Sequence, residues 1–274
     1  MNTLTDISVV GRAARLGRAF VPTTLFTPGT TGAWFDPADR ASLFQDAAGT
    51  VPVTAAGQPV GRMLDKSGLG RHATQSVGAA RPTYRLDSNG RAYLEFDGVD
   101  DWMSFGPLSL SGKTAATLAL ALRKTQDVGS GLVFATGTWL GAGIDIRSPG
   151  AWGAANFGAN AQSTSGAQSI GVTTSNHAAP LPAAMTLEID LAKPAGAELS
   201  LRVNHVAFAQ TTGTTLESGG SLAGTTAYLG RRQDAPVLLF SGRLYGFMLL
   251  ARGVSAVERQ QLEFLMAQRI GVTP

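Results

Sequence analysis

From Trp34 to about Leu250, the chain consists of short hydrophobic runs that turn-forming residues separate. The run Leu199–Val203 alternates apolar and polar residues, which predicts a strand with one buried face. The run Thr117–Leu122 is apolar along its length, which predicts a strand covered on both faces. Many short strands at regular spacing favour a two-sheet β-sandwich. The predicted strands are Gly32–Phe35, Tyr93–Phe96, Trp102–Phe105, Ala115–Leu122, Gly131–Ala135, Gly143–Arg147, Met185–Asp190, Leu199–Val203, Thr226–Leu229 and Gly242–Leu250.

A helix is predicted at the C-terminal end of the chain. Ser255 and Glu258 form an S-x-x-E capping box, in which Ser255 caps the helix and Glu258 reaches back to it. Gly271 is a natural C-cap. The apolar stripe between the caps consists of Leu262, Leu265, Met266 and Ile270. We therefore expect one amphipathic α-helix between Ser255 and Gly271.

Residues 1–30 differ from the rest of the chain. Apolar residues fall there at helical spacing with arginines beside them, and a connector rich in Pro, Gly and Thr follows. The apolar residues are Val9, Ala13, Leu16 and Phe20, and the arginines are Arg12, Arg15 and Arg18. We expect residues 1–30 to be an arm and linker for docking or oligomerisation, with a strand and loop packed on the domain as the alternative. Residues 31–274 then form one β domain.

The composition limits the classes of protein to which the chain can belong and the kinds of metal site that it can form. The chain has 274 residues and is 44% hydrophobic, enough for one large all-β domain or two small ones with a sizeable core. Its 34 glycines follow no three-residue period, which favours many tight turns. Cysteine is absent and only three histidines are present, so we expect no disulfide and no thiolate- or histidine-bound metal. We expect the protein to have no cofactor. The sequence leaves open one exception, a Ca²⁺ ion bound by oxygen ligands.

Charge and hydropathy limit the kinds of partner that the chain is expected to bind. The net charge of +3 is mild, and the arginines, including the adjacent Arg231 and Arg232, are not interleaved with aromatic residues. We therefore expect no nucleic-acid partner. No apolar run reaches the roughly 18–20 residues that cross a bilayer, so we expect no membrane insertion. The first residues lack a basic stretch followed by an apolar one, so we expect synthesis in the bacterial cytoplasm without a signal peptide.

Three blocks in the first third place an aspartate beside glycine or proline and near an apolar or aromatic residue. They are W-F-D-P-A-D at 34–39, L-D-K-S-G-L-G-R-H-A-T-Q at 64–75 and L-E-F-D-G-V-D-D-W at 94–102. Such combinations predict tight turns. Together with F-S-G-R-L-Y-G-F-M-L-L-A-R-G-V-S at 240–255, they resemble a concanavalin A-like, laminin-G-type jelly-roll domain of the kind found in bacteriophage virion proteins. The resemblance covers about residues 33–273, with a divergent middle.

The resemblance implies an all-β fold, namely a concanavalin A-like two-sheet jelly-roll sandwich with one C-terminal α-helix and an N-terminal arm. It also implies a non-enzymatic structural or surface module of a phage virion, on its head or tail. Such a module would form a homo-oligomer and contact other virion proteins and host-surface polysaccharide. A stand-alone bacterial carbohydrate-binding protein and a degenerate glycoside hydrolase are the alternatives.

The candidate glycan-binding residues lie in the middle of the chain. Sugars are commonly bound by an aromatic face against the sugar ring, with amide and acidic groups on the hydroxyls. We predict this role for a set of two tryptophans and three polar residues, with a place in the core as the alternative for the tryptophans. The set consists of Trp139, Asp145, Trp152, Asn156 and Asn160.

The segment L-E-I-D-L-A-K at 187–193 resembles the E-x-D-x-E signature of laminarinase-type glycoside hydrolases, which share the concanavalin A-like fold. Glu188 and Asp190 are present, but the third acidic position is Ala192 or Lys193. Retaining hydrolysis needs both a nucleophile and an acid/base carboxylate. We therefore expect Glu188 and Asp190 to be solvent-facing strand residues, and the chain to have no catalytic residue.

Asp97, Asp100 and Asp101 surround Gly98 at a spacing that can offer carboxylate oxygens to Ca²⁺. The alternative, which we favour, is that Asp97 and Asp101 bind backbone amides and hold a turn.

Asp65, Ser67 and His72 bring together the residue types of a hydrolase. However, no G-x-S-x-G nucleophile elbow occurs in a strand–turn–helix context. We expect this block to be a surface loop whose His72 and Gln75 pack against the edge of a sheet.

Overall fold

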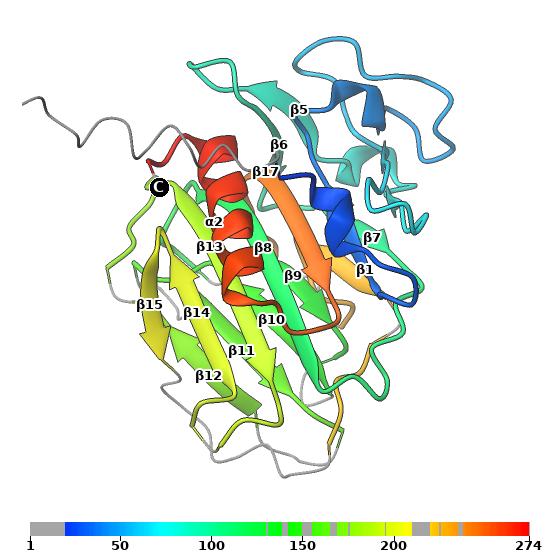
Figure 1. The fold of residues 1–274 in the computed structure, drawn as a ribbon. Coiled ribbons are helices and arrows are strands. Elements are labelled where there is room, and N and C mark those ends of the chain that lie inside the picture. The colour runs from blue at the N-terminus through cyan, green and yellow to red at the C-terminus, as the bar shows by residue number, and fades with distance from the viewer. Residues whose placement is uncertain are drawn as a thin grey trace, which may run out of the picture.

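The computed structural model shows a sandwich of two β-sheets with an α-helix on one side (Figure 1). It describes residues 20–129, 131–138, 142–149, 155–164, 169–174, 176–194, 196–209, 220–224, 226–234 and 238–273. Every strand pair within the two sheets is antiparallel over these residues. The two-sheet, mostly β fold predicted from the hydrophobic pattern is confirmed.

The first sheet, sheet A, has eight strands over the described residues. Their order is β15 (Val206–Ala209), β14 (Leu199–Val203), β13 (Ala183–Asp190), β8 (Ala115–Lys124), β17 (Ser241–Leu250), β6 (Ala92–Asp97) and β5 (Thr83–Leu86), and β1 (Gly32–Phe35) also pairs with β17. The long strands β8 and β17 form its centre, which is why the sequence makes them almost continuously apolar.

The second sheet, sheet B, has nine strands over the described residues. Their order is β12 (Ser169–Thr173), β11 (Gly158–Gln162), β10 (Gly143–Arg147), β9 (Leu132–Thr136), β16 (Ala227–Leu229), β7 (Met103–Phe105), β4 (Ala73–Thr74), β3 (Arg62–Met63) and β2 (Leu43–Phe44). Short 3₁₀ turns occur at η1 (Pro22–Leu25), η2 (Arg40–Ser42) and η3 (Gly78–Ala80).

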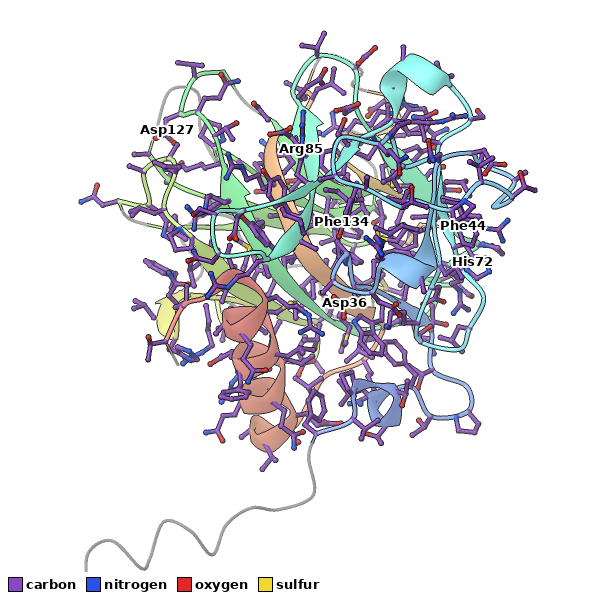
Figure 2. The ribbon with its side chains drawn as sticks, turned by 90° about the horizontal axis from the view of Figure 1, so that it is seen from above. Asp36, Phe44, His72, Arg85, Asp127 and Phe134 are labelled. Carbon is purple, nitrogen blue, oxygen red and sulfur yellow. The ribbon has the colours of Figure 1, made fainter. Side chains whose placement is uncertain are left out.

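The larger core lies between the two sheets. Alternate residues of each strand point into it, so Leu118 and Leu120 of β8 are completely buried there. Phenylalanines from both sheets meet in its middle, and the ring centroids of Phe134 and Phe247 are 5.2 Å apart. Figure 2 shows Phe134 among the side chains of the interior, with Asp127 at the periphery.

A second core lies between the outer face of sheet A and helix α2 (Ala256–Ile270). The helix crosses in front of β13, β8 and β17 (Figure 1) and packs Leu262, Met266 and Ile270 onto them. Because β8 has a core on each side, the prediction that its apolar run is covered on both faces is confirmed.

The caps of α2 are those that the sequence predicts. The Ser255 side chain accepts a hydrogen bond from the N–H of Glu258, and the Glu258 side chain accepts one from the N–H of Ser255. Gly271 ends the helix in the left-handed conformation, with φ of 75°.

The described part of the predicted N-terminal arm packs on the domain. Leu25 of η1 is 2% exposed and belongs to the core beneath α2, and Phe20 and Phe26 pack against that core. The backbone carbonyl of Leu25 accepts a hydrogen bond from Arg252 at 3.1 Å. Residues 1–19 lie outside the described residues, so the docking role of the arm stays a prediction.

The outer faces of sheets A and B differ in whether a helix packs on them. Over the described residues α2 is the only α-helix, and it packs on sheet A. No α-helix of this part of the chain packs on the outer face of sheet B.

Candidate functional site

A row of outward-pointing residues crosses the outer face of sheet B. Tyr228 of β16 pairs with Ser104 of β7 on one side and with Ala135 of β9 on the other. Ala135 pairs with Asp145 of β10, which pairs with Asn160 of β11. Residues paired across neighbouring strands point to the same face, so strand pairing brings Tyr228, Asp145 and Asn160 onto one surface. We call this surface the sheet-B row.

A polar cluster forms one part of the sheet-B row. Arg147 makes a two-point ion pair with Asp145, with Nε–Oδ1 at 2.9 Å and Nη2–Oδ2 at 3.1 Å. The Asn160 amide also donates to Oδ1 of Asp145, at 2.9 Å. These contacts hold a carboxylate, a guanidinium and an amide in a fixed arrangement that can hydrogen-bond to hydroxyl groups.

An aromatic cluster forms the other part of the sheet-B row. The ring centroids of Trp102 and Tyr228 lie 5.9 Å apart, and the Arg231 guanidinium lies 3.5 Å from the centroid of Trp102 and 5.4 Å from that of Tyr228. Burial lowers the pKa of Arg231, and its Nε is buried with no hydrogen-bond partner. Trp102 and Arg231 remain partly exposed, whereas Tyr228 is buried, with 9% of its surface exposed. The neighbouring Arg232 is instead buried in an ion pair with Asp234.

The structure brings together two of the five predicted glycan-binding residues, Asp145 and Asn160. Asn156 lies before β11, where its backbone carbonyl accepts a hydrogen bond from the buried ammonium group of Lys124 at 3.1 Å. Trp139 and Trp152 lie outside the described residues. The glycan-binding role of all five stays a prediction.

The sequence reasoning missed Trp102, Tyr228 and Arg231. A signal for Trp102 was present, because Trp102 and Ser104 alternate with the core residues Met103 and Phe105. Alternation places Trp102 on the outer face of sheet B. Its meeting with Arg231 depends on the pairing of β7 with β16, which no local pattern reveals.

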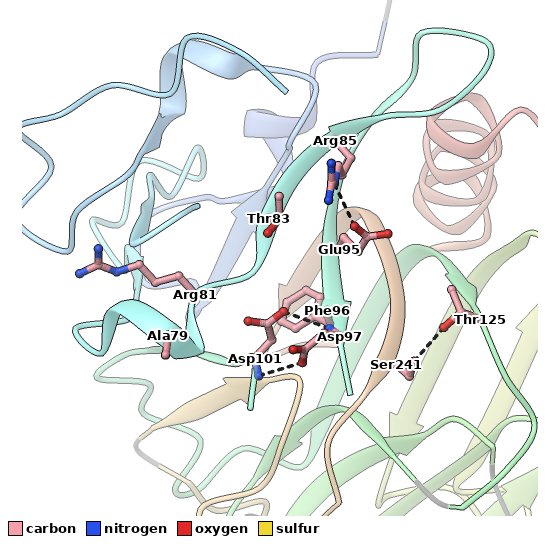
Figure 3. Close-up of a pocket in the computed structure, with 10 residues that line it drawn as sticks. All are labelled: Ala79, Arg81, Thr83, Arg85, Glu95, Phe96, Asp97, Asp101, Thr125 and Ser241. Atoms are coloured by element: carbon pink, nitrogen blue, oxygen red, sulfur yellow. Dashed lines mark hydrogen bonds and ion pairs between the residues drawn. The ribbon is translucent and has the colours of Figure 1, made fainter. Parts of the chain in front are cut away.

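A cleft of about 400 Å³ lies on the opposite side of the sandwich, on the outer side of sheet A (Figure 3). Its lining is polar and carries both signs of charge. Arg85 and Glu95 form an ion pair in it, with Nε–Oε2 at 2.9 Å. The lining residues are Ala79, Arg81, Thr83, Arg85, Glu95, Phe96, Asp97, Asp101, Thr125 and Ser241.

The aspartates at one end of this cleft hold a turn. The Asp97 carboxylate accepts hydrogen bonds from the N–H groups of Val99, Asp100 and Asp101, at 2.7, 3.2 and 3.4 Å. Asp101 accepts one from the N–H of Asp97 at 3.0 Å. The structural alternative favoured from the sequence is confirmed. Carboxylate oxygens of Asp97, Asp100 and Asp101 lie within 4.8 Å of one another, and those of Asp97 and Asp101 accept the hydrogen bonds of the turn.

The block around Asp65 is also structural. Asp65 accepts hydrogen bonds from the N–H groups of Trp34, Ser67 and Arg71 and from the Ser67 hydroxyl. His72 accepts one from the N–H of Asp65 through Nδ1, at 3.0 Å. Ser67 and His72 therefore each bind Asp65 and form no nucleophile–base pair. Gln75 is 1% exposed and donates to the carbonyl of Trp102, so it packs against sheet B as expected.

Glu188 and Asp190 lie on the outer face of sheet A. Glu188 forms an ion pair with Arg259 of α2 at 3.3 Å, and Asp190 accepts a hydrogen bond from the N–H of Ala192 at 3.1 Å. The residues between and beside them, Leu187 and Ile189, point into the core. These contacts give Glu188 a structural role in holding the helix. Its side chain is 16% exposed and faces α2, so the expectation that Glu188 faces solvent is wrong.

No family model and no curated protein matches the sequence. Among solved structures, the binding domain of Paraclostridial Mosquitocidal Protein 1 matches with a TM-score of 0.55 and 14% identity, over 78% of this chain and 51% of that domain. The binding domain of Botulinum neurotoxin serotype D matches with a TM-score of 0.53 and 8% identity, over 76% and 48%. The serotype D ligand-binding domain in complex with N-acetylneuraminic acid matches with a TM-score of 0.51 and 10% identity, over 75% and 48%.

These matches define the class of fold. The chain is a β-sandwich of the kind found in toxin binding domains, and it spans about half the length of the domains it matches. No described helix is long and apolar enough to cross a membrane. At these identities the likeness concerns the fold, and function must be argued from the site.

Proposed function

We propose that this protein is a non-enzymatic carbohydrate-binding module whose binding surface is the sheet-B row. The observation that carries the proposal is the combination of the partly exposed Trp102 and Arg231 with the fixed Asp145–Arg147–Asn160 cluster on the outer face of sheet B. Aromatic rings pack against the apolar side of a sugar, and paired acidic, amide and guanidinium groups bind its hydroxyls.

Binding without turnover is supported by the surroundings of Asp145. Glycoside hydrolysis uses two carboxylates on either side of the scissile bond. Along the sheet-B row the neighbours of Asp145 are Ala135 and Asn160, and its own carboxylate is ion-paired with Arg147. An arrangement with one neutralised carboxylate is suited to binding a sugar and not to cleaving it.

The matched structures support the proposal at the level of the fold. They are binding domains, and one of them was solved with N-acetylneuraminic acid. A sandwich of this kind can therefore carry a sugar site, which leaves the residues of the sheet-B row to decide the specificity.

We further propose, on the sequence resemblance, that the module sits on a phage virion as a homo-oligomer, attached by residues 1–30. Virion proteins and host-surface polysaccharide are then its partners. Electron microscopy of the source particle, with light scattering of the full chain and of a chain lacking residues 1–30, tests this. A stand-alone bacterial carbohydrate-binding protein would be found on no particle.

Glycan-array screening of the full chain tests the carbohydrate-binding proposal, followed by calorimetric titration and a hydrolysis assay with the best glycan. We expect saturable binding without cleavage. The variant Trp102→Ala should lose about two- to tenfold in affinity, because one stacked ring contributes about 0.5–1.5 kcal/mol. The matched control Arg259→Ala, on the other side of the sandwich, should bind like the wild type. Product release from the glycan, or equal affinity in Trp102→Ala, would refute the proposal.

A further inference from the structure

Strand β15 forms one edge of sheet A, and within the described residues no strand pairs with its far side (Figure 1). The strand contains no charged residue and no proline, and its pairing with β14 contains no bulge. Val206 is 57% exposed, and Ala207 and Ala209 are exposed beside it. An edge strand without charges, proline or a bulge offers its unpaired backbone groups to another strand.

The sheet edges at β5 and β2 are covered by other parts of the chain. Tyr84 of β5 donates its N–H to the carbonyl of Gln58 at 2.9 Å and accepts a hydrogen bond from the N–H of Gly57 at 2.8 Å. Residues 51–53 cover β2 in the same way, with backbone hydrogen bonds of 2.7 and 3.0 Å. No such hydrogen bond reaches β15 from the described part of the chain, so β15 differs from both of these edges.

The backbone groups on the far side of β15 belong to Ala207 and Ala209. The turn from β14 into β15 consists of Asn204 and His205, whose φ angles of 49° and 68° are those of a two-residue type I′ hairpin. The residues that flank such a turn bond to each other, so Val206 faces β14. Because the direction alternates along a strand, the N–H and C=O groups of Ala207 and Ala209 point away from β14.

We propose that β15 pairs with β15 of a second copy of this chain, antiparallel and about a two-fold axis that passes between the two copies of Phe208. In this register Ala207 of one copy lies opposite Ala209 of the other, and each such pair exchanges two backbone hydrogen bonds. The two Phe208 side chains, which are partly buried against the main core, then lie opposite each other. The uncharged strand suits its own copy as a partner, because a charged residue would meet a like charge near the axis.

The proposed pairing joins sheet A of two copies into one continuous sheet. Two four-residue strands make a small interface, so we expect an equilibrium between monomer and dimer that depends on concentration. The interface uses β15 alone and depends neither on carbohydrate binding at the sheet-B row nor on the N-terminal arm. A chain lacking residues 1–19, which keeps Phe20 and Leu25 in place, should therefore dimerise like the full chain.

Disulfide trapping of single-cysteine variants tests the register, because the chain has no cysteine of its own. In Phe208→Cys the two thiols belong to directly opposed residues, whose Cα atoms are about 4.5 Å apart, within reach of a disulfide. In the matched control Val206→Cys they belong to residues displaced by about 13 Å along the strands. Under mild oxidation Phe208→Cys should form covalent dimers at least about tenfold faster than Val206→Cys.

A mixed pair of variants gives a readout that does not depend on replacing Phe208, whose loss from the edge of the core can lower stability. Cysteines at positions 207 and 209 lie opposite each other only when Ala207→Cys is mixed with Ala209→Cys. The mixture should therefore cross-link faster than either variant alone.

Sedimentation velocity over a range of concentrations measures the association without any cysteine. Ala209→Pro removes an N–H from the far side of β15 and none from the pairing with β14, so it should fold like the wild type in far-UV circular dichroism. It should weaken the dimer at least about fivefold, since two symmetry-related hydrogen bonds are lost. The proposal is overturned if the mixture cross-links no faster than its components, or if Ala209→Pro associates as strongly as the wild type. Occupation of this edge by the same chain, or dimerisation through another surface, would give those results.

Discussion

The substitution Asp101→Asn should remove a pH dependence of stability that the turn between β6 and β7 creates. Asp101 is 5% exposed. Burial, together with the nearby charges of Asp97, Asp100 and Glu95, raises the pKa of Asp101 from 3.8 to about 7. Between these two values the folded chain keeps a proton that the unfolded chain has released.

The sign and size of the effect follow from proton linkage. Because the folded state binds more protons than the unfolded state, the free energy of unfolding falls as the pH rises from about 4 to about 7, and this loss is complete above pH 7. A rise from 3.8 to about 7, at about 1.36 kcal/mol for each pH unit, corresponds to on the order of 4 kcal/mol. Asn at position 101 is neutral throughout, and its side-chain oxygen can still accept the hydrogen bond from Asp97.

Urea unfolding at pH 4.5, 6 and 8 measures the effect as a difference between the two proteins. Asp101→Asn should lie within about 1 kcal/mol of the wild type at pH 4.5 and exceed it by a few kcal/mol at pH 8. Asp100→Asn is the matched control, because it removes a charge from the same turn but leaves Asp101 free to titrate. Parallel stability profiles for the wild type and Asp101→Asn would refute the reasoning, as would a loss of pH dependence in Asp100→Asn alone.

Three further substitutions test the packing. Ser255→Ala removes the N-cap of α2 and should cost about 1 kcal/mol in urea unfolding; no change would contradict the cap assignment. Gly271→Ala should lower Tm, since φ is +75° there and an added Cβ would lie 2.4 Å from the Arg91 guanidinium carbon; an unchanged Tm would count against this geometry. Lys124→Met leaves Asp127 without its ion-pair partner and should cost about 2–4 kcal/mol, most of which Lys124→Met with Asp127→Asn should restore; a double variant no more stable than Lys124→Met would contradict the reasoning that the unpaired Asp127 charge causes the loss.

The parts of the fold that follow from local signals could be predicted from the sequence. The caps Ser255 and Gly271 and the apolar stripe between them define α2, and the alternation of Leu199–Val203 defines β14 with its bounds. The strands β2, β3, β4, β5, β11 and β12 and the exposed edge strand β15 were missed. Segments of two to five residues are too short to show a clear periodicity of their own, and their extended conformation depends on pairing with another strand.

The same limit explains what the sequence shows of the site. Asp145 and Asn160 were singled out because their side chains suit a sugar, and the antiparallel pairing of β10 with β11 places them together. Trp102 and Arg231 are far apart along the chain and meet only through the pairing of β7 with β16. Which residue types are present can be read from the sequence, but which of them meet is decided by long-range strand pairing.

The measurement that tests the central claim most directly is an NMR titration of the ¹⁵N-labelled tryptophan indole groups with the best-binding glycan. The chain has four tryptophans, so each indole N–H gives one signal that single Trp→Phe variants assign. The account predicts a saturable shift of the Trp102 signal, while Trp34, which lies in the core beneath α2, stays unchanged. Saturable shifts of Trp139 and Trp152 without a shift of Trp102 would contradict the claim that the sheet-B row is the binding surface.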